Sequence, residues 1–158
     1  MSLADILNIM WVTFLPFLEL RASIPFGIIS GVHWSLVFVI AVVTNILLGI
    51  FLYHILDRVI YYFTKIDFID KLYGRYVEKT QKKIHSLIEK YGEFALAVFI
   101  GIPLPGSGVY SGALAAYLLG FEKKKFIVAC IWGVLIAGVL VTLVSVLGLE
   151  MFQVFLKE

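Results

Sequence analysis

Two charged residues, Glu19 and Arg21, lie within otherwise apolar sequence and are the first candidates for chemistry. A charge at bilayer depth costs about 2.5–3.5 kcal/mol on insertion scales, so such residues usually serve a function. Arg21 could bind an anionic group, and Glu19 could take up and release a proton that drives transport. Alternatively, the two form a structural ion pair, because an unpaired buried charge is far costlier than a paired one. On a regular helix they would point about 200° apart, so a shared target requires the unwound backbone that Pro16 and Pro25 favour.

A second candidate is the stretch Gly101-Ile-Pro-Leu-Pro-Gly-Ser-Gly108, which continues into Val-Tyr-Ser-Gly112. Its prolines lack backbone donors and its glycines permit conformations that a helix excludes, so it predicts a break followed by a half-helix. The free N–H groups at a helix start attract anions, and a phosphate or carboxylate could bind there opposite Arg21. Alternatively, the glycines only let two segments pack closely, as small residues do in membrane helices.

The remaining polar residues give weaker signals. Asn45 lies between Ala41 and Gly49 at four-residue spacing, which favours a packing face, although its amide could bond to a broken backbone. The three histidines and the one cysteine have no metal-ligand or triad spacing, so we expect no enzyme, no metal and no cofactor. The candidate substrate- or ion-binding residues are Glu19, Arg21, Ser23, Pro25, Asn45, Pro103, Pro105, Gly106, Ser107, Gly108, Tyr110 and Ser111.

The elements that must position these residues are apolar helices. Of the 158 residues, 61% are hydrophobic and only 15% are charged, which a soluble domain of this size cannot hide in its interior. A bilayer core of about 30 Å takes roughly 20 helical residues to cross. Four stretches are long enough, namely residues 6–32, 34–56, 94–121 and 126–149. The second and fourth are uninterrupted and predict ordinary spanning helices, whereas the first and third are interrupted by proline.

The basic residues predict the topology. Eight of the thirteen lie between Asp57 and Glu93, and three more form the run Lys123-Lys124-Lys125. Lys and Arg are enriched in cytoplasmic loops, so the segments 57–93 and 122–125 are expected to be cytoplasmic loops of a multi-pass cell-membrane protein. Residues 94–121 then begin and end on the same side but are too short for two crossings, which predicts a helix that dips in, breaks and returns. Residues 6–32 could insert in the same way from the opposite face.

The two halves of the chain repeat this architecture. Each has a broken apolar segment, a glycine-bearing turn and an uninterrupted helix, and an offset of 89 positions superposes Leu15-Pro16 on Leu104-Pro105 and Gly31 on Gly120. We expect one all-α membrane domain over residues 1–158, with two inverted-topology repeats at about 6–56 and 94–156. Each repeat is a Pro/Gly-broken re-entrant helical hairpin plus one transmembrane helix. Residues 57–93 join them as a cytoplasmic amphipathic helical linker.

The motifs resemble a known family. Glu19-Leu-Arg-Ala-Ser-Ile-Pro-Phe-Gly27 and Ile102-Pro-Leu-Pro-Gly-Ser-Gly108-Val-Tyr-Ser-Gly-Ala-Leu-Ala-Ala116 look like the two signature stretches of the small multidrug export family of prokaryotic membrane proteins, and the similarity covers nearly the whole chain. Members of that family look distantly like DedA-type proteins. The resemblance implies paired opposed re-entrant hairpins, acidic and arginine site residues, and drug efflux or transport of a polyprenyl phosphate.

These observations predict a membrane transporter, with proton coupling through Glu19, for an amphipathic or anionic lipid-like substrate. The alternatives are a polyprenyl-phosphate flippase of DedA-like type and, from another class, a non-transporting membrane scaffold. Membrane lipids are the expected partners, and nothing in the sequence predicts nucleic-acid binding. Two crossings and two hairpins hardly enclose a solute path, so we also expect a homodimer or larger assembly.

Overall fold

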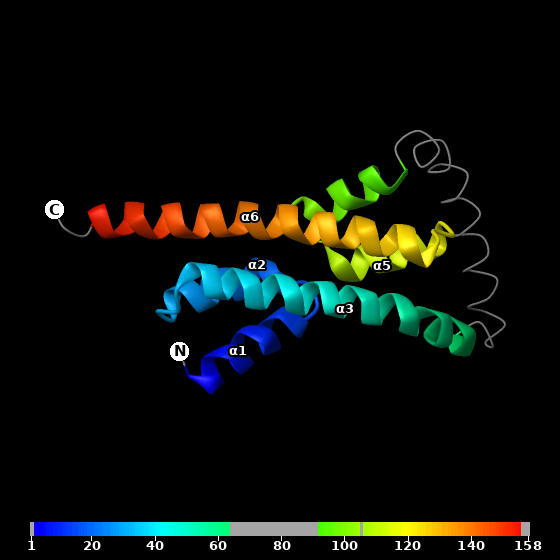
Figure 1. Cartoon of the computed structure of the whole chain (residues 1–158), viewed down its shortest axis with the longest axis horizontal. Helices are drawn as coiled ribbons and strands as arrows, with labels where there is room; N and C mark the ends of the chain where they lie inside the picture. Colours follow the sequence, from blue (N-terminus) through cyan, green and yellow to red (C-terminus); the bar gives the residue numbers. More distant parts are fainter. Residues whose placement is uncertain (1, 64–91, 105, 156–158) are drawn as a thin grey trace.

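The computed structural model describes residues 2–63, 92–104 and 106–155, and these ranges contain helices and no strand (Figure 1). The all-helical class is therefore confirmed. The helices are α1 (Leu3–Phe14), α2 (Glu19–Ile29), α3 (Trp34–Phe63), a short helix Gly92–Gly101, α5 (Val109–Leu118) and α6 (Lys123–Phe155).

Two of these helices are long and apolar enough to cross a membrane. The candidate spans are Trp34–Leu56 within α3 and Lys123–Leu149 within α6. They pack side by side and run in opposite directions (Figure 1). The sequence predicts a loop at Lys123-Lys124-Lys125, but these residues form the first turn of α6. A helix can begin there because lysine stems lie along an apolar surface while their ammonium groups reach water.

The first broken segment turns at residues 15–18, between α1 and α2. Leu15, which precedes Pro16, is extended with φ −73° and ψ 128°, as the residue before a proline tends to be. Phe17 and Glu19 then take positive φ values of 69° and 46°, which are unusual for residues with side chains. Pro25 was expected to help make the break, but it lies inside α2, so Pro16 alone marks it.

The second broken segment has its break where the glycines and prolines predict it. The helix Gly92–Gly101 ends at the first glycine of the motif, and α5 begins directly after Gly108. Gly106 and Gly108 have φ values of 86° and 138°, so both use the conformational freedom that only glycine has. Pro105 lies outside the described residues.

The two broken segments approach the middle of the bundle from opposite ends. In Figure 1, α1 leads from the left towards the middle and α2 leads back, whereas the helix Gly92–Gly101 starts near the right end and α5 returns there. Both α2 and α5 end in the same turn, in which Gly31 and Gly120 have φ values of 84° and 69°. The N–H of the residue after each glycine donates to the C=O five residues earlier, at 3.1 Å and 2.9 Å. The offset of 89 positions thus relates backbone geometry as well as sequence.

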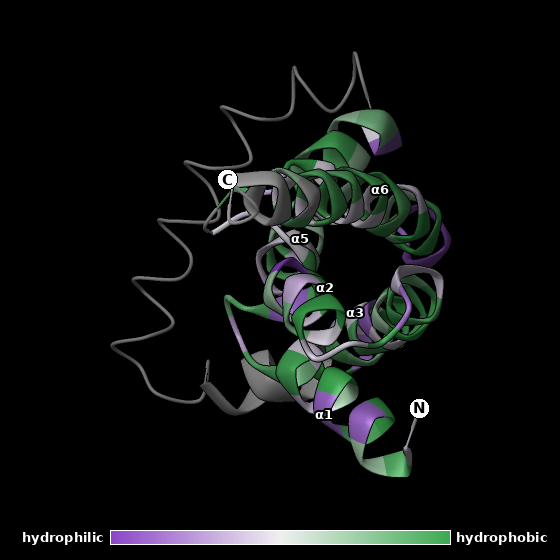
Figure 2. Ribbon diagram, turned by 90° about the vertical axis from the view of Figure 1, so that its left-hand side faces the viewer, coloured by the Kyte–Doolittle hydropathy of each residue, from purple (hydrophilic) through white to green (hydrophobic). Residues whose placement is uncertain are grey.

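The core lies where α2, α3, α5 and α6 meet, and small residues bring the helices close together. Ala41, Ala113 and Cys130 are buried there, so Cys130 is a packing residue of the core. Large apolar side chains are exposed on α1, α3 and α6, including Phe51 and Trp132. The hydrophobic colour predominates along α3 and α6 in Figure 2. A contiguous apolar exterior of this kind is typical of a surface that lipid covers.

The linker expectation is partly corrected. Residues 57–63 are not a separate surface segment, because α3 continues through them to Phe63. Residues 92 and 93 likewise belong to the helix Gly92–Gly101. Residues 64–91 lie outside the described residues.

Candidate functional site

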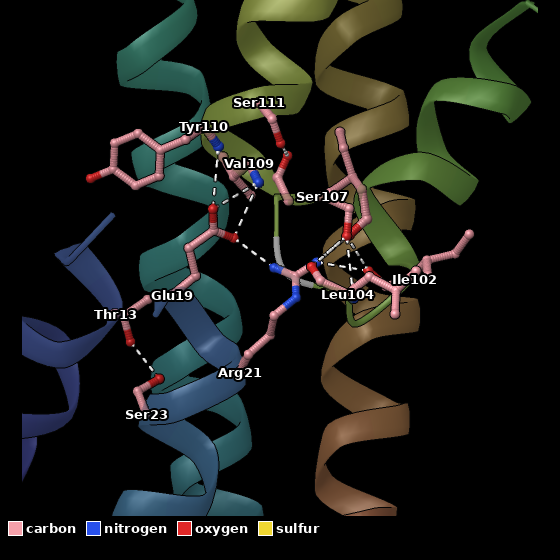
Figure 3. A network of polar contacts seen from close by, with 12 residues as sticks. Thr13, Glu19, Arg21, Ser23, Ile102, Leu104, Ser107, Val109, Tyr110 and Ser111 are labelled. Carbon is pink, nitrogen blue, oxygen red and sulfur yellow. Dashed lines mark hydrogen bonds and ion pairs between the residues drawn. The ribbon is translucent and has the colours of Figure 1, made fainter. Parts of the chain in front are cut away.

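The site forms where both breaks meet in the middle of the bundle (Figure 3). Four helix ends come together there: the end of α1, the start of α2, the end of the helix Gly92–Gly101 and the start of α5. Every helix end leaves backbone N–H or C=O groups without a partner inside the helix. In an apolar environment these groups must be satisfied by other parts of the protein.

Glu19 accepts hydrogen bonds from the free backbone N–H groups at the start of α5. Its side chain is only 3% exposed, and its carboxylate accepts hydrogen bonds from the backbone N–H groups of Val109 at 3.1 Å and Tyr110 at 3.3 Å. Gly108, the residue in the N-cap position, has no side chain that could do this. An anion at a helix N-terminus is also favoured by the helix dipole. Glu19 is therefore the cap of a helix that begins 90 residues further along the chain.

Arg21 forms hydrogen bonds with the backbone on the other side of this break, at the end of the helix Gly92–Gly101. Its Nη1 donates to the Glu19 carboxylate at 3.0 Å, and its Nη2 lies 3.2 Å from Ile100 O and 2.9 Å from Ile102 O. These carbonyls end the helix Gly92–Gly101, where the helix dipole favours a cation. The Nε of Arg21 is buried and has no hydrogen-bond partner within residues 2–63, 92–104 and 106–155.

Ser107 holds the loop between the two half-helices. Its hydroxyl accepts from Arg21 Nη2 at 3.2 Å and lies 2.6 Å from Ile102 O and 2.8 Å from Leu104 O. One hydroxyl thus links the guanidinium to two loop carbonyls. Ser111 makes a long contact of 3.4 Å to Gly108 O within its own half-helix.

Gly108 is the point of closest approach between the two motifs. A Cβ atom built on it would lie 2.6 Å from both Arg21 Nη1 and Glu19 Oε2. Its φ of 138° is itself strained for any residue with a side chain. The ion pair can therefore reach the start of α5 only because this position has no side chain.

Tyr110 completes the arrangement in the opposite direction. Its hydroxyl donates to Phe14 O at 2.6 Å, which satisfies a carbonyl at the end of α1. Residues of the first broken segment thus cap the second, and a residue of the second caps the first. The two segments lock together by reciprocal capping.

The geometry decides part of what the sequence left open. Glu19 and Arg21 form an ion pair at 3.0 Å, and the positive φ of Glu19 departs from the regular helix that would point them apart. The sequence suggests that an external anion binds at the start of α5 opposite Arg21, but the Glu19 carboxylate occupies that position. Arg21 and Ser107 are in direct contact rather than apart.

Other predicted residues lie away from the ion pair. Ser23 is buried and bonds to the Thr13 hydroxyl at 2.7 Å, so it joins α1 to α2. Asn45 is 1% exposed, and none of the described residues offers a hydrogen-bond partner to its amide oxygen or amide nitrogen. Gly106 forms the turn of the loop with open space around it. None of these three contacts the charged pair through a hydrogen bond in the described part of the chain.

Pro25 and Pro103 join Arg21 in the wall of an open groove of about 650 Å³. Sequence reasoning missed the α6 residues that form the rest of this groove, because an uninterrupted apolar helix gives no signal for which face is open. It also missed Thr13 and the backbone groups of Ile100, Ile102 and Val109. Backbone partners are available at any residue type, so no sequence pattern marks them.

The comparison with known families agrees with this architecture. A family model described as "Putative small multi-drug export protein" matches residues 19–140, which is more than half of the chain. This range contains the motifs of both broken segments, all of α3 and the first part of α6. No curated protein and no solved structure gives a significant match. The family is named for export and is not an enzyme family. The chain is therefore a membrane protein that belongs to the small multi-drug export protein family.

Proposed function

We propose that this protein is a secondary transporter that moves an anionic, amphipathic substrate and couples this movement to protonation of Glu19. The observation that carries the proposal is the buried Glu19–Arg21 pair at the meeting point of two broken apolar segments. Ionisable residues within membrane segments usually mark substrate, ion or proton pathways. Discontinuous helices that meet near the midplane are a common binding site in secondary transporters.

The proposed topology places α3 and α6 across the cell membrane and makes both broken segments re-entrant from opposite faces. The two halves are then inverted repeats. Three features support this: the opposite directions of the long helices, the opposite approach of the broken segments, and the matching turns after α2 and α5. The segments 57–93 and 122–125 are on the cytoplasmic side in this proposal, in line with their lysines.

The site chemistry suggests how coupling works. The Glu19 carboxylate uses the donors that an anionic substrate would need, namely Arg21 Nη1 and the N–H groups of Val109 and Tyr110. A proton on Glu19 removes its charge and weakens all three hydrogen bonds, so a substrate anion can then take these donors. Because the two events favour each other, anion binding takes up a proton and anion release returns it.

A lipid-like substrate is favoured by the surroundings of the pair. The groove beside Arg21 is lined mostly by aliphatic side chains, so an apolar portion of a substrate could lie there. A lipid-phosphate flippase is therefore the second candidate, with the same site and a substrate that stays in the membrane. A non-transporting scaffold is the alternative from another class and predicts no flux. We also propose a homodimer, because one copy supplies few helices to enclose a path.

Flux in proteoliposomes tests the proposal. Purified protein is reconstituted with a pH gradient, and the movement of a fluorescent alkyl phosphate is compared with that of a cationic dye. We expect gradient-dependent movement of the alkyl phosphate in the wild type. Glu19→Gln, which keeps the shape but cannot exchange a proton, is expected to lose the dependence on the gradient.

The matched control is Glu122→Gln, the same chemical change at an exposed carboxylate outside the site. It is expected to transport like the wild type. Arg21→Ala is expected to abolish movement, with thermal stability in detergent measured to separate loss of function from loss of fold. Wild-type coupling in folded Glu19→Gln would refute the assignment of Glu19, and absence of flux for both probes would favour the scaffold.

A further inference from the structure

One groove of the molecule connects the charged site to the outer apolar surface. Its volume is about 650 Å³, and Arg21, Pro25 and Pro103 form the end of its wall that belongs to the broken segments. The rest of its lining comes from one face of α6 between Leu140 and Leu149. At a rise of 1.5 Å per residue, this face extends over roughly 14 Å.

The chemistry of the groove is divided between its ends. Among the described residues, Arg21 is the only charged one in the lining, which does not include Glu19. The Arg21 Nε also has no hydrogen-bond partner among the described residues. The α6 face is aliphatic except for Ser145, whose hydroxyl bonds back to Val141 O at 2.7 Å and therefore offers little polarity. An anionic group at one end and an apolar group along α6 would complement this surface.

The groove is open along its side rather than closed over. Val144 is 73% exposed and Leu140 is 41% exposed, so its rim lies on the apolar exterior of the bundle. A Cβ atom built at Gly148 would lie in open space, with no atom of another part of the protein within 4 Å. Its volume lies within the range of about 300–1,000 Å³ that small-molecule sites occupy.

We propose that this groove binds a single-chain amphiphile whose anionic headgroup lies at Arg21 and whose hydrocarbon chain lies along α6. The substrate then enters sideways from the lipid and not from water. Binding in the groove is a property of the chain by itself, whereas its role as a transport route rests on the proposed function. The size of the groove favours one chain over the two chains of a bilayer phospholipid.

Photolabelling tests this placement directly. The full-length protein in phosphatidylcholine nanodiscs is irradiated with dodecyl phosphate that carries a diazirine near the end of its chain, and the labelled peptides are identified by mass spectrometry. We expect adducts on α6 between Leu140 and Leu149. A charge-assisted hydrogen bond strengthens binding by about tenfold or more, so the matching diazirine dodecanol should label this face about tenfold less.

Two phenylalanine substitutions on α6 provide a matched pair. Gly148→Phe places a ring in the open part of the groove and should abolish labelling of this face. Leu143→Phe adds a ring on the same helix at a position that is 53% exposed and outside the groove lining. This variant should be labelled as strongly as the wild type. Thermal stability in detergent shows that both variants are folded.

The outcomes separate this proposal from the proposed function. Adducts away from this face, equal labelling by the alcohol, or wild-type labelling of Gly148→Phe would overturn the groove assignment, and transport by Glu19 and Arg21 would be unaffected. Labelling as described without any flux in proteoliposomes would establish the binding site and refute the transporter.

Discussion

Gly108→Ala tests whether reciprocal capping holds the two broken segments together. The new Cβ would lie 2.6 Å from Arg21 Nη1 and Glu19 Oε2, so these atoms must move. They are the ends of flexible side chains, and the cost is therefore not steric overlap but the hydrogen bonds that they lose. Each charge-assisted bond contributes about 1.5–3 kcal/mol. Backbone strain at a φ of 138° adds about 1–3 kcal/mol. We expect a total loss of about 3–6 kcal/mol in unfolding free energy.

Gly106→Ala is the control for backbone strain alone. Gly106 also has a positive φ, 86°, but a Cβ there would meet no atom within 4 Å. A left-handed conformation costs about 1–2 kcal/mol for a residue with a side chain. The assay is thermal and denaturant-induced unfolding of the two variants and the wild type in the same detergent, followed by flux in liposomes. The capping argument is refuted if Gly108→Ala is no less stable than Gly106→Ala and transports equally well.

Three further substitutions test other contacts, each by unfolding in detergent. Tyr110→Phe removes the hydrogen bond to Phe14 O and should cost about 1 kcal/mol, whereas an unchanged midpoint would mean that this cap contributes nothing. Gly49→Ala puts a Cβ 2.5 Å from Val109 Cγ1 and should lower the unfolding free energy by about 1–3 kcal/mol. Adding Val109→Ala to the same chain should restore part of this stability. If it restores none, the overlap lies with another residue. Asn45→Leu removes a buried amide that has no hydrogen-bond partner in the described part of the chain, so it should stabilise the fold by about 1–3 kcal/mol. Destabilisation would indicate a polar partner for Asn45.

The fold was largely predictable because its signals are local. Uninterrupted apolar runs marked α3 and α6, and the Pro- and Gly-rich motif located the second break to within a residue or two. The first break was less well located. Pro25 and Pro16 look alike in sequence, but Pro25 is accommodated within α2, where tertiary packing outweighs the lost hydrogen bond.

The sequence singled out the charged pair and the loop residues that contact it, but not how they are connected. Glu19 and Arg21 are recognisable because charged residues are rare in apolar sequence. Ser107 and Gly108 are recognisable because they belong to a loop rich in glycine and serine. Glu19 caps α5 because of its positive φ and because the backbone N–H groups of Val109 and Tyr110 face its carboxylate. An external anion would have to displace this carboxylate. Neither the positive φ of Glu19 nor the free backbone N–H groups at the start of α5 can be read from composition or residue spacing.

The reciprocal caps also bear on how the chain is made. The ribosome synthesises Phe14 and Glu19 long before Val109 and Tyr110, which are their hydrogen-bond partners in the finished protein. Arg21 is likewise made long before Ile100 and Ile102, whose carbonyls accept its hydrogen bonds. Until then the first broken segment carries an ion pair and a backbone carbonyl without their final partners, and it has little reason to settle at bilayer depth. With the proposed re-entrant topology, we therefore expect insertion of the first half to be reversible until the second half is synthesised and supplies these contacts. A truncated first half should be retained at the membrane surface or degraded, while supplying the second half as a separate chain should rescue it.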